Sequence, residues 1–196
     1  MKTLLLLPFA FAFLAVPTSP DAPVLRGEHD WSVDSVHSSV HWKVKHCGAS
    51  WSKGAFDTIT GTVSLDPKAP EAGSVKLVIP TASIHSGDKK RDEHLLGPDF
   101  FNAKENPEIT FTSTKIAKKG DALAVTGDLS IAGKKQSVTI DVAHVGDGEF
   151  YGKRRGYTST FTIKRSEFGV SYGIDNGSLG DEVTLSIDIE LVQPKK

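Results

Sequence analysis

Residues 39–46 read SVHWKVKH, and this octapeptide decides the fold class. Apolar and polar side chains alternate along it. One face carries Val40, Trp42, Val44 and His46, and the other face is polar throughout. Because successive side chains of a β-strand point to opposite faces of the sheet, a period of two predicts a half-buried strand.

Further segments of the same kind follow along the chain, most of them rich in Val, Ile, Thr and Phe, which suit a pleated surface. They span residues 58–65, 74–84, 109–116, 122–131, 136–145, 157–164 and 183–191. Turn residues connect them at Asp66-Pro67, Lys119-Gly120-Asp121, Ala132-Gly133-Lys134, Gly146-Asp147-Gly148 and Asp175-Asn176-Gly177. Close strand spacing with little helical periodicity predicts an all-β up-and-down antiparallel barrel or a sandwich.

One short helix is expected over residues 89–96. Asp88 can cap its first turn, and Gly97, followed by Pro98, ends it. The helix is mostly charged, so few of its residues can pack. Four apolar residues in and just after it could plug or rim one end of a barrel: Leu95, Leu96, Phe100 and Phe101.

The N-terminus has the composition of a signal peptide. Lys2 precedes an apolar run from Leu4 to Val16 that only Pro8 interrupts. This run is shorter than the ~20 residues that cross a bilayer, so we expect no stable membrane span. We assign residues 1–22 to the signal peptide, with the cleavage position left open, 23–29 to a flexible lead-in, and 30–193 to a single β-barrel domain.

The composition excludes several other classes of protein. Hydrophobic residues make up 38% and charged residues 24%, which excludes a disordered chain and a multi-spanning membrane protein. The net charge of −1 argues against a nucleic-acid-binding protein. The single cysteine, Cys47, cannot form an intramolecular disulfide, and we interpret it as a small residue near a strand end rather than a redox or acylated site.

Motifs spread over the domain occur in one consistent order. They are Asp34, His37-Ser38 and the strand to His46, Gly54-x-Phe56, Gly61, Asp66, Ser83-Ile84, residues 90–95, 99–101, 106–111 and 127–133, Arg165-x-x-Phe168-Gly169, and Asp181-Glu182-Val183. In content and order they resemble the YceI-like polyisoprenoid-binding family. The chain departs from that pattern at residues 58–60 and at Ala132, which leaves the shape of the pocket open.

The resemblance implies an extended, lipocalin-like eight-stranded antiparallel β-barrel with one short helix. It also implies that the protein lies in the periplasm and that its interior holds an isoprenoid or another long-chain amphiphile. A barrel of this size is just wide enough for filled side chains or one slim ligand. The inward-facing candidates are Trp42, Val44, Phe56, Leu77, Ile79, Phe111, Phe161 and Ile163. Each of these could contact a ligand or fill a dry core, and both alternatives stay open.

Arg91 and His94 lie three residues apart on the expected helix, next to other cations. They could bind a phosphate or polar head group at the mouth of the barrel. Alternatively, Arg91 could pair with Asp88 or Asp92 and fix the helix to a neighbouring loop, which is the interpretation we favour.

Two other motifs suggest a metal site and a hydrolase nucleophile, and the expected geometry excludes both. His37, His41 and His46 would be ~13 Å apart or on opposite faces of the strand at ~3.3 Å per residue, so we predict no metal site there. Residues 169–173 spell GVSYG, but the nucleophile turn of a hydrolase needs a histidine downstream, and none follows Ser171.

These observations predict a non-catalytic periplasmic binding or carrier protein for an isoprenoid or quinone-like lipid, with no cofactor and with a homodimer as an option. One alternative is a surface-interaction or stress-response protein with a filled barrel. Another is a lipid-modifying enzyme, which would require a polar residue of perturbed pKa in the pocket. The volume of the interior separates the first alternative from the carrier, because a packed interior excludes a ligand.

Overall fold

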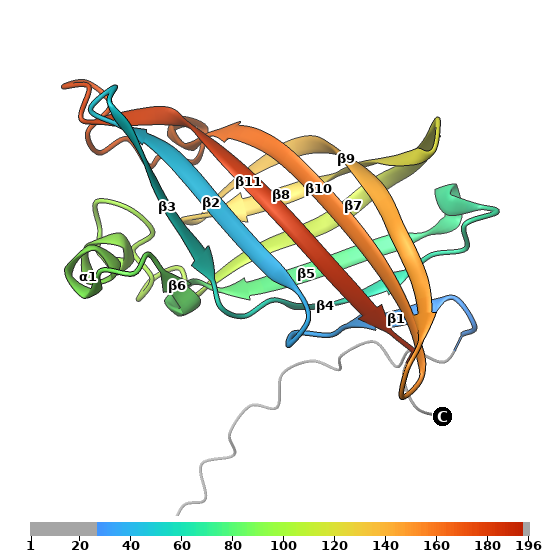
Figure 1. Ribbon diagram of the computed structural model, residues 1–196. Coiled ribbons are helices and arrows are strands. Elements are labelled where there is room, and N and C mark those ends of the chain that lie inside the picture. The colour runs from blue at the N-terminus through green and yellow to red at the C-terminus, as the bar shows by residue number, and fades with distance from the viewer. Residues whose placement is uncertain (1–26, 194–196) are drawn as a thin grey trace, which may run out of the picture.

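Figure 1 shows the computed structural model of the chain, which describes residues 27–193. The predicted signal peptide therefore lies outside the described residues. The strands are β1 (Asp30–Val33), β2 (Ser39–His46), β3 (Ser50–Phe56), β4 (Thr60–Ser64), β5 (Ser74–Pro80), β6 (Ile84–His85), β7 (Glu108–Lys119), β8 (Ala122–Ile131), β9 (Lys134–Glu149), β10 (Lys153–Lys164) and β11 (Leu179–Val192). The helices are α1 (Lys89–Leu96) and three 3₁₀ turns, η1 (Pro70–Ala72), η2 (Thr81–Ser83) and η3 (Arg165–Phe168).

The strands form a closed antiparallel barrel. Around the barrel the order is β1-β4-β5-β7-β8-β9-β10-β11, and β1 pairs with the last residues of β11 to close it. The earlier part of β11 pairs with β2, which pairs with β3, which pairs with β6. β1 and β2 thus follow one another along the same edge of β11. The predicted all-β, eight-stranded barrel with one short helix is confirmed.

The alternation in residues 39–46 produces the strand it predicts. β2 has the bounds of that octapeptide, and Val40, Trp42 and Val44 are buried while His41 and Lys43 are exposed. The octapeptide is followed by a strand that the sequence analysis missed, β3. Its apolar period is hidden because Gly54 occupies an inward position and Trp51 an outward one.

The turn predicted at Gly146-Asp147-Gly148 is wrong. These residues lie inside β9 and pair with residues 154–156 of β10. The chain reverses at Phe150–Gly152 instead, where Tyr151 and Gly152 have φ angles of 53° and 119°. Two glycines indicate a turn by composition, but here the ladder with β10 keeps them extended, and a bulge between Gly156 and Tyr157 absorbs the irregularity.

Helix α1 covers one end of the barrel (Figure 1). It begins as predicted, because the Asp88 carboxylate accepts a hydrogen bond from the Arg91 backbone N–H at 2.8 Å. It ends at Gly97, which is extended rather than left-handed. Leu95, Leu96 and Phe101 pack against the main core. The apolar residues around α1 therefore rim this end of the barrel, which we call the α1 end. Within residues 27–193, no helix has the length and apolar character to cross a bilayer.

Candidate functional site

The interior of the barrel contains an apolar cavity of about 460 Å³. Inward-facing side chains of β2, β3, β5 and β7 to β11 form its wall. Residues of α1, Phe100, Phe101 and the connection between β10 and β11 line it at the α1 end. Its volume falls in the range of small-molecule sites, about 300–1,000 Å³. The side chains of the barrel therefore do not fill the part of its interior that adjoins the α1 end.

All the inward-facing candidates line this cavity: Trp42, Val44, Phe56, Leu77, Ile79, Phe111, Phe161 and Ile163. Their contact with a ligand stays a prediction. Other lining residues were missed, among them Leu129, Ile131, Val138, Ile140, Leu185 and Ile187. The signal that would have found them is the same period-two alternation in the segments that form β8, β9 and β11.

A second apolar cavity, of about 80 Å³, lies at the opposite end of the barrel. Val63, Leu65 and Leu191 line its outer part. Four side chains line both cavities and separate them, and we call them the collar: Leu77, Phe111, Ile140 and Ile187. The two cavities therefore follow one another along the barrel axis.

Three rings lie over the mouth of the larger cavity, which is at the α1 end. The His94 ring centroid is 5.0 Å from those of Phe100 and Tyr172, and the latter two are 5.2 Å apart. His94 Nε2 also lies 2.8 Å from Asp99 Oδ2. This ring cluster joins α1, the loop after it and the β10–β11 connection, so it partly covers the mouth.

Arg91 also lines the mouth of the cavity. Its hydrogen-bond partners differ from those that we predicted. Its Nε donates to Ser86 Oγ at 2.8 Å and its Nη2 to Ser86 O at 2.9 Å. The predicted pairing with Asp88 or Asp92 is wrong: Asp88 accepts from the backbone N–H of Arg91, and Asp92 accepts from Ser86. The predicted attachment of the helix to a neighbouring segment is present, but through Ser86. Arg91 thus ties α1 to the segment before it while remaining at the mouth.

Two buried polar groups interrupt the apolar wall. The Arg165 side chain is 7% exposed, and its guanidinium donates to the carbonyls of Gly180 at 2.8 Å, Val170 at 3.2 Å and Leu179 at 3.3 Å. Burial lowers the pKa of this guanidinium. The Trp42 Nε1–H is buried and has no hydrogen-bond partner among the described residues.

Residues 31–191 match the YceI-like domain family. The chain belongs to the YceI-like family. The Protein YceI of Escherichia coli O157:H7 is 37% identical over 170 residues, which cover 85% of this chain and 88% of that protein. The Protein YceI of Salmonella agona is 35% identical over 192 residues, covering 97% and 98%.

Solved structures show the same barrel. Burkholderia cenocepacia BcnA matches with a TM-score of 0.74 and 33% identity, covering 81% of this chain and 98% of that chain. A polyisoprenoid binding domain from Saccharophagus degradans matches with a TM-score of 0.66 at 16% identity, covering 84% and 98%, which is a likeness of fold.

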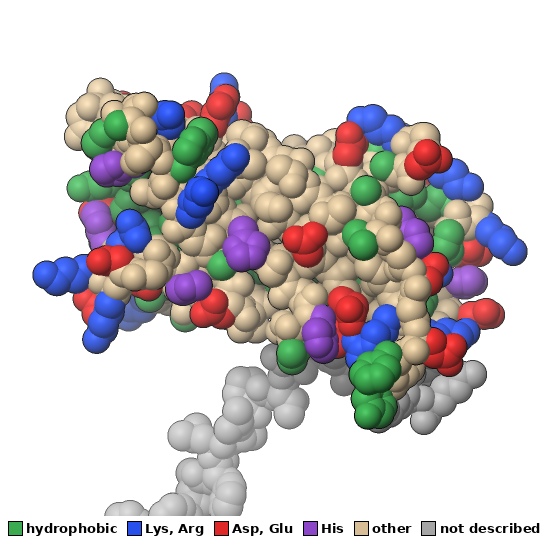
Figure 2. All heavy atoms as spheres, in the orientation of Figure 1, with side chains coloured by type: hydrophobic (Ala, Val, Ile, Leu, Met, Phe, Trp, Pro, Cys, Tyr) green, Lys and Arg blue, Asp and Glu red, His purple; other side chains and the backbone are tan. Residues whose placement is uncertain are grey.

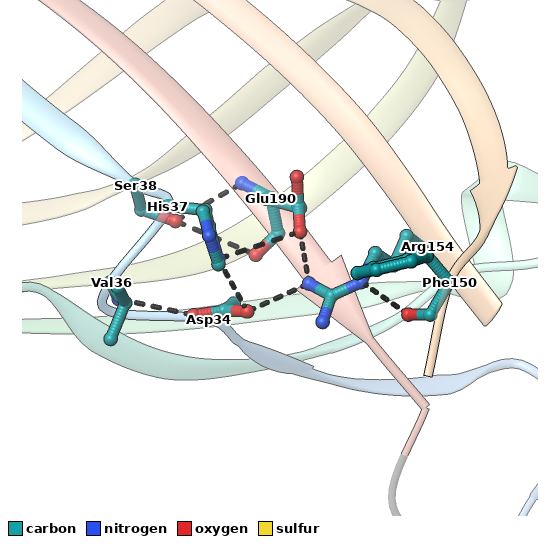
Figure 3. Close-up of polar contacts among 7 residues, drawn as sticks. All are labelled: Asp34, Val36, His37, Ser38, Phe150, Arg154 and Glu190. Atoms are coloured by element: carbon teal, nitrogen blue, oxygen red, sulfur yellow. Dashed lines mark hydrogen bonds and ion pairs between the residues drawn. The ribbon is translucent and has the colours of Figure 1, made fainter. Parts of the chain in front are cut away.

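His41 and His46 lie on opposite faces of β2, as predicted. His41 is exposed on the outer face of β2, while His46 lines the cavity. His37 lies near Asp34 and Glu190, and the ligand atoms of these three fall within 4.8 Å of one another. Figure 3 shows that the Arg154 guanidinium lies between the two carboxylates and donates to both. This cluster is an ion-pair network whose positive charge the protein itself supplies.

The remaining hydrolase-like motif is a structural turn. Gly169 ends η3 in the left-handed conformation, and Val170 is buried against the cavity. Ser171 is exposed and precedes a run of turns rather than a helix. The nucleophile turn of a hydrolase requires a strand before the serine and a helix after it, so this segment does not have that geometry.

Proposed function

We propose that this protein is a non-catalytic carrier that holds an isoprenoid or another long-chain amphiphilic lipid inside the barrel, in the periplasm. The observation that carries the proposal is the apolar cavity of about 460 Å³ along the barrel axis. The resemblance of the N-terminal residues to a signal peptide supports export. The structural likeness to a polyisoprenoid binding domain supports the class of ligand.

The wall of the cavity favours a hydrocarbon chain. Each methylene buried there contributes about 0.8 kcal/mol before the cost of association is subtracted. The aromatic residues of the wall, such as Phe56, Phe111 and Phe161, offer flat surfaces to branched or unsaturated chains. A prenyl or acyl chain can therefore bind tightly without strong polar contacts.

The polar part of the ligand would lie at the α1 end. Arg91 and His94 remain our candidates for contact with a head group, since both line the mouth. The buried Arg165 guanidinium adds positive charge at the same end, because its carbonyl partners belong to the start of β11 and to the connection before it. The chain end of the ligand would point toward the collar.

The two alternatives are less well supported. A surface-interaction protein with a filled barrel fits poorly with a cavity of this size. An enzyme needs a nucleophile or an acid–base pair directed at the ligand. Polar side chains such as Ser52, His46 and His94 do line the cavity. Among the described residues, however, His94 Nε2 is engaged by Asp99, and no hydrogen bond joins His46 to a serine of the wall. We therefore assign no residue a chemical step.

The first experiment is native mass spectrometry of the protein recovered from a bacterial periplasm, followed by extraction and identification of the bound fraction. A stoichiometric adduct with the mass of a prenyl or fatty-chain lipid supports the proposal and names the ligand. The mass of the chain also locates the N-terminus after export. A ligand-free mass, with no uptake of added prenyl lipids, would refute it.

A pair of variants tests whether the lipid lies in the barrel. Ile163→Trp places a large ring in the cavity, and Thr162→Trp places the same ring on the outer face of the same strand. We expect the inward variant to lose the adduct while folding normally, and the outward variant to keep it. Equal loss or equal retention would move the binding site elsewhere.

A further inference from the structure

The outer face of the β2–β3 hairpin carries an exposed tryptophan between two lysines. Trp51 is 49% exposed, and the ammonium groups of Lys43 and Lys45 lie 5.1 and 5.0 Å from its ring centroid. Lys53 is the cross-strand partner of Lys43. We call these four residues the basic hairpin face. Trp51 packs no core, so burial within the barrel does not explain it.

The basic hairpin face has no carboxylate within its own two strands. Residues 39–56 contain neither aspartate nor glutamate. Among the described residues, none of the three lysines forms an ion pair. On the adjoining strand β11, the residue in register with Lys43 is Thr184, which is uncharged. Glu182 of β11 is in register with a lysine of the strand on its other side, Lys164 of β10. Since the whole chain has a net charge of −1, any attraction to an anionic surface must come from a local patch of this kind.

The same hairpin forms part of the cavity mouth. Its inner face contributes Val44, His46 and Ser52 to the cavity wall at the α1 end. In Figure 2, which has the orientation of Figure 1, lysine or arginine side chains stand beside a hydrophobic one over the region where β2 and β3 lie. The basic face and the entrance to the cavity are thus two sides of one hairpin.

We propose that the basic hairpin face docks on the surface of an anionic lipid bilayer and holds the cavity mouth against it. Tryptophan prefers the interface between water and lipid, where its ring is amphipathic. Lysine ammonium groups next to it are attracted to anionic head groups within a Debye length. The inference goes beyond the carrier function, because docking requires no cargo in the barrel.

The opposite end of the barrel is less suited to this role. Phe150 and Tyr151 are exposed at the tip of the β9–β10 hairpin, where Figure 2 shows a hydrophobic patch at the lower right. The nearby arginines are already paired, Arg154 with Asp34 and Glu190, and Arg155 with Asp147. That end therefore has exposed aromatic side chains whose neighbouring arginines are already paired with carboxylates.

The test is binding of the protein, recovered from the periplasm, to vesicles of phosphatidylglycerol with phosphatidylcholine, compared with vesicles of phosphatidylcholine alone. We expect co-sedimentation with the anionic vesicles only, weakened by salt. Trp51 also serves as the probe, since the other two tryptophans, Trp31 and Trp42, are 4% and 9% exposed. Its emission should shift to the blue on docking and be quenched by brominated lipid.

Lysine variants test whether the basic hairpin face is responsible for binding to the vesicles. Lys43→Gln, Lys45→Gln and Lys53→Gln together should weaken binding by on the order of a hundredfold, about fivefold for each lysine. The matched control, Lys68→Gln, Lys118→Gln and Lys153→Gln, removes three exposed lysines at the other end and should change little. All variants carry the same N-terminus, so its contribution cancels in the comparison.

Four outcomes would overturn the proposal. One is equal binding to both kinds of vesicle. Another is a larger loss in Phe150→Ser, Tyr151→Ser than in the lysine variant. A blue shift that persists in Trp51→Phe would come from the cavity and indicate cargo entry without docking. A dimer that only the lysine variant abolishes would assign the face to a second copy of the chain.

Discussion

Arg154 of β10 donates a hydrogen bond to Asp34, 120 residues earlier in the chain, at 2.8 Å. The same Nη1 donates to Glu190 of β11, and Arg154 Nε donates to Phe150 O at 2.9 Å (Figure 3). Asp34 follows β1, whose pairing with β11 closes the barrel. One guanidinium therefore joins the first segment of the barrel to its last two strands.

We predict that Arg154→Met destabilises the barrel. The methionine keeps much of the stem but removes the donors, so two neighbouring carboxylates lose their shared cation. Thermal or urea unfolding would show a lower midpoint, and Lys153→Met, one residue away and exposed, should leave it unchanged. If both variants unfold like the parent, the network contributes nothing to closure.

Stability should fall in acid through Asp34. Its hydrogen bond from Arg154, then that with His37, holds the pKa of Asp34 well below its usual value. A carboxylate whose pKa is lower in the folded than in the unfolded chain stabilises the fold fully above the unfolded value of about 3.9 and loses this contribution as the pH falls further. Asp34→Asn should therefore be less stable than the parent at pH 7, with the difference shrinking toward pH 3.

Urea unfolding at several pH values measures this difference. Asp175→Asn, which removes an exposed carboxylate from a turn, is the control and should follow the parent at every pH. A difference for Asp34→Asn that stays constant from pH 7 to pH 3 would show that its charge is not what stabilises the fold.

Gly54→Ala should destabilise the protein by roughly 1–3 kcal/mol, because an added methyl overpacks the interior. A Cβ at this position would collide with the Trp42 ring and with the His85 carbonyl. The free energy of unfolding measures the cost, and Gly146→Ala, whose Cβ would meet no atom within 4 Å, is the matched control. Similar values for the two variants would mean that the Trp42 ring and the backbone at His85 both move away at little cost.

Tyr172→Ala should open the mouth of the cavity. The substitution removes one of the three rings that lie across it, and since Tyr172 is 47% exposed we expect little change in stability. A bound long-chain fluorescent probe should dissociate several-fold faster, as happens when a cover over a site is loosened. Tyr151→Ala, at the opposite end, should dissociate like the parent. Unchanged rates in both would mean that the probe does not leave through the α1 end.

Local chemistry sufficed for most of the strands and for α1, but not for β3, where Gly54 at an inward position hides the apolar period. The alternation in residues 39–46 defined β2, and the capping carboxylate of Asp88 placed the start of α1. The period-two alternation also identified inward side chains such as Phe111 and Ile163, because the period of a strand fixes which residues share a face. The same logic failed at residues 146–148, where a turn-like composition was outweighed by pairing with β10.

Tertiary structure alone decided the partners and the empty space. The sequence by itself determined the helix, most of the strands and the side chains that share a face of each predicted strand, since these depend on neighbours within a few residues. It could not show that Arg91 binds Ser86 or that Arg154 joins Asp34 to Glu190. Nor could it show that the inward side chains leave a cavity, because the volume of an interior depends on how strands distant in sequence are spaced around the barrel.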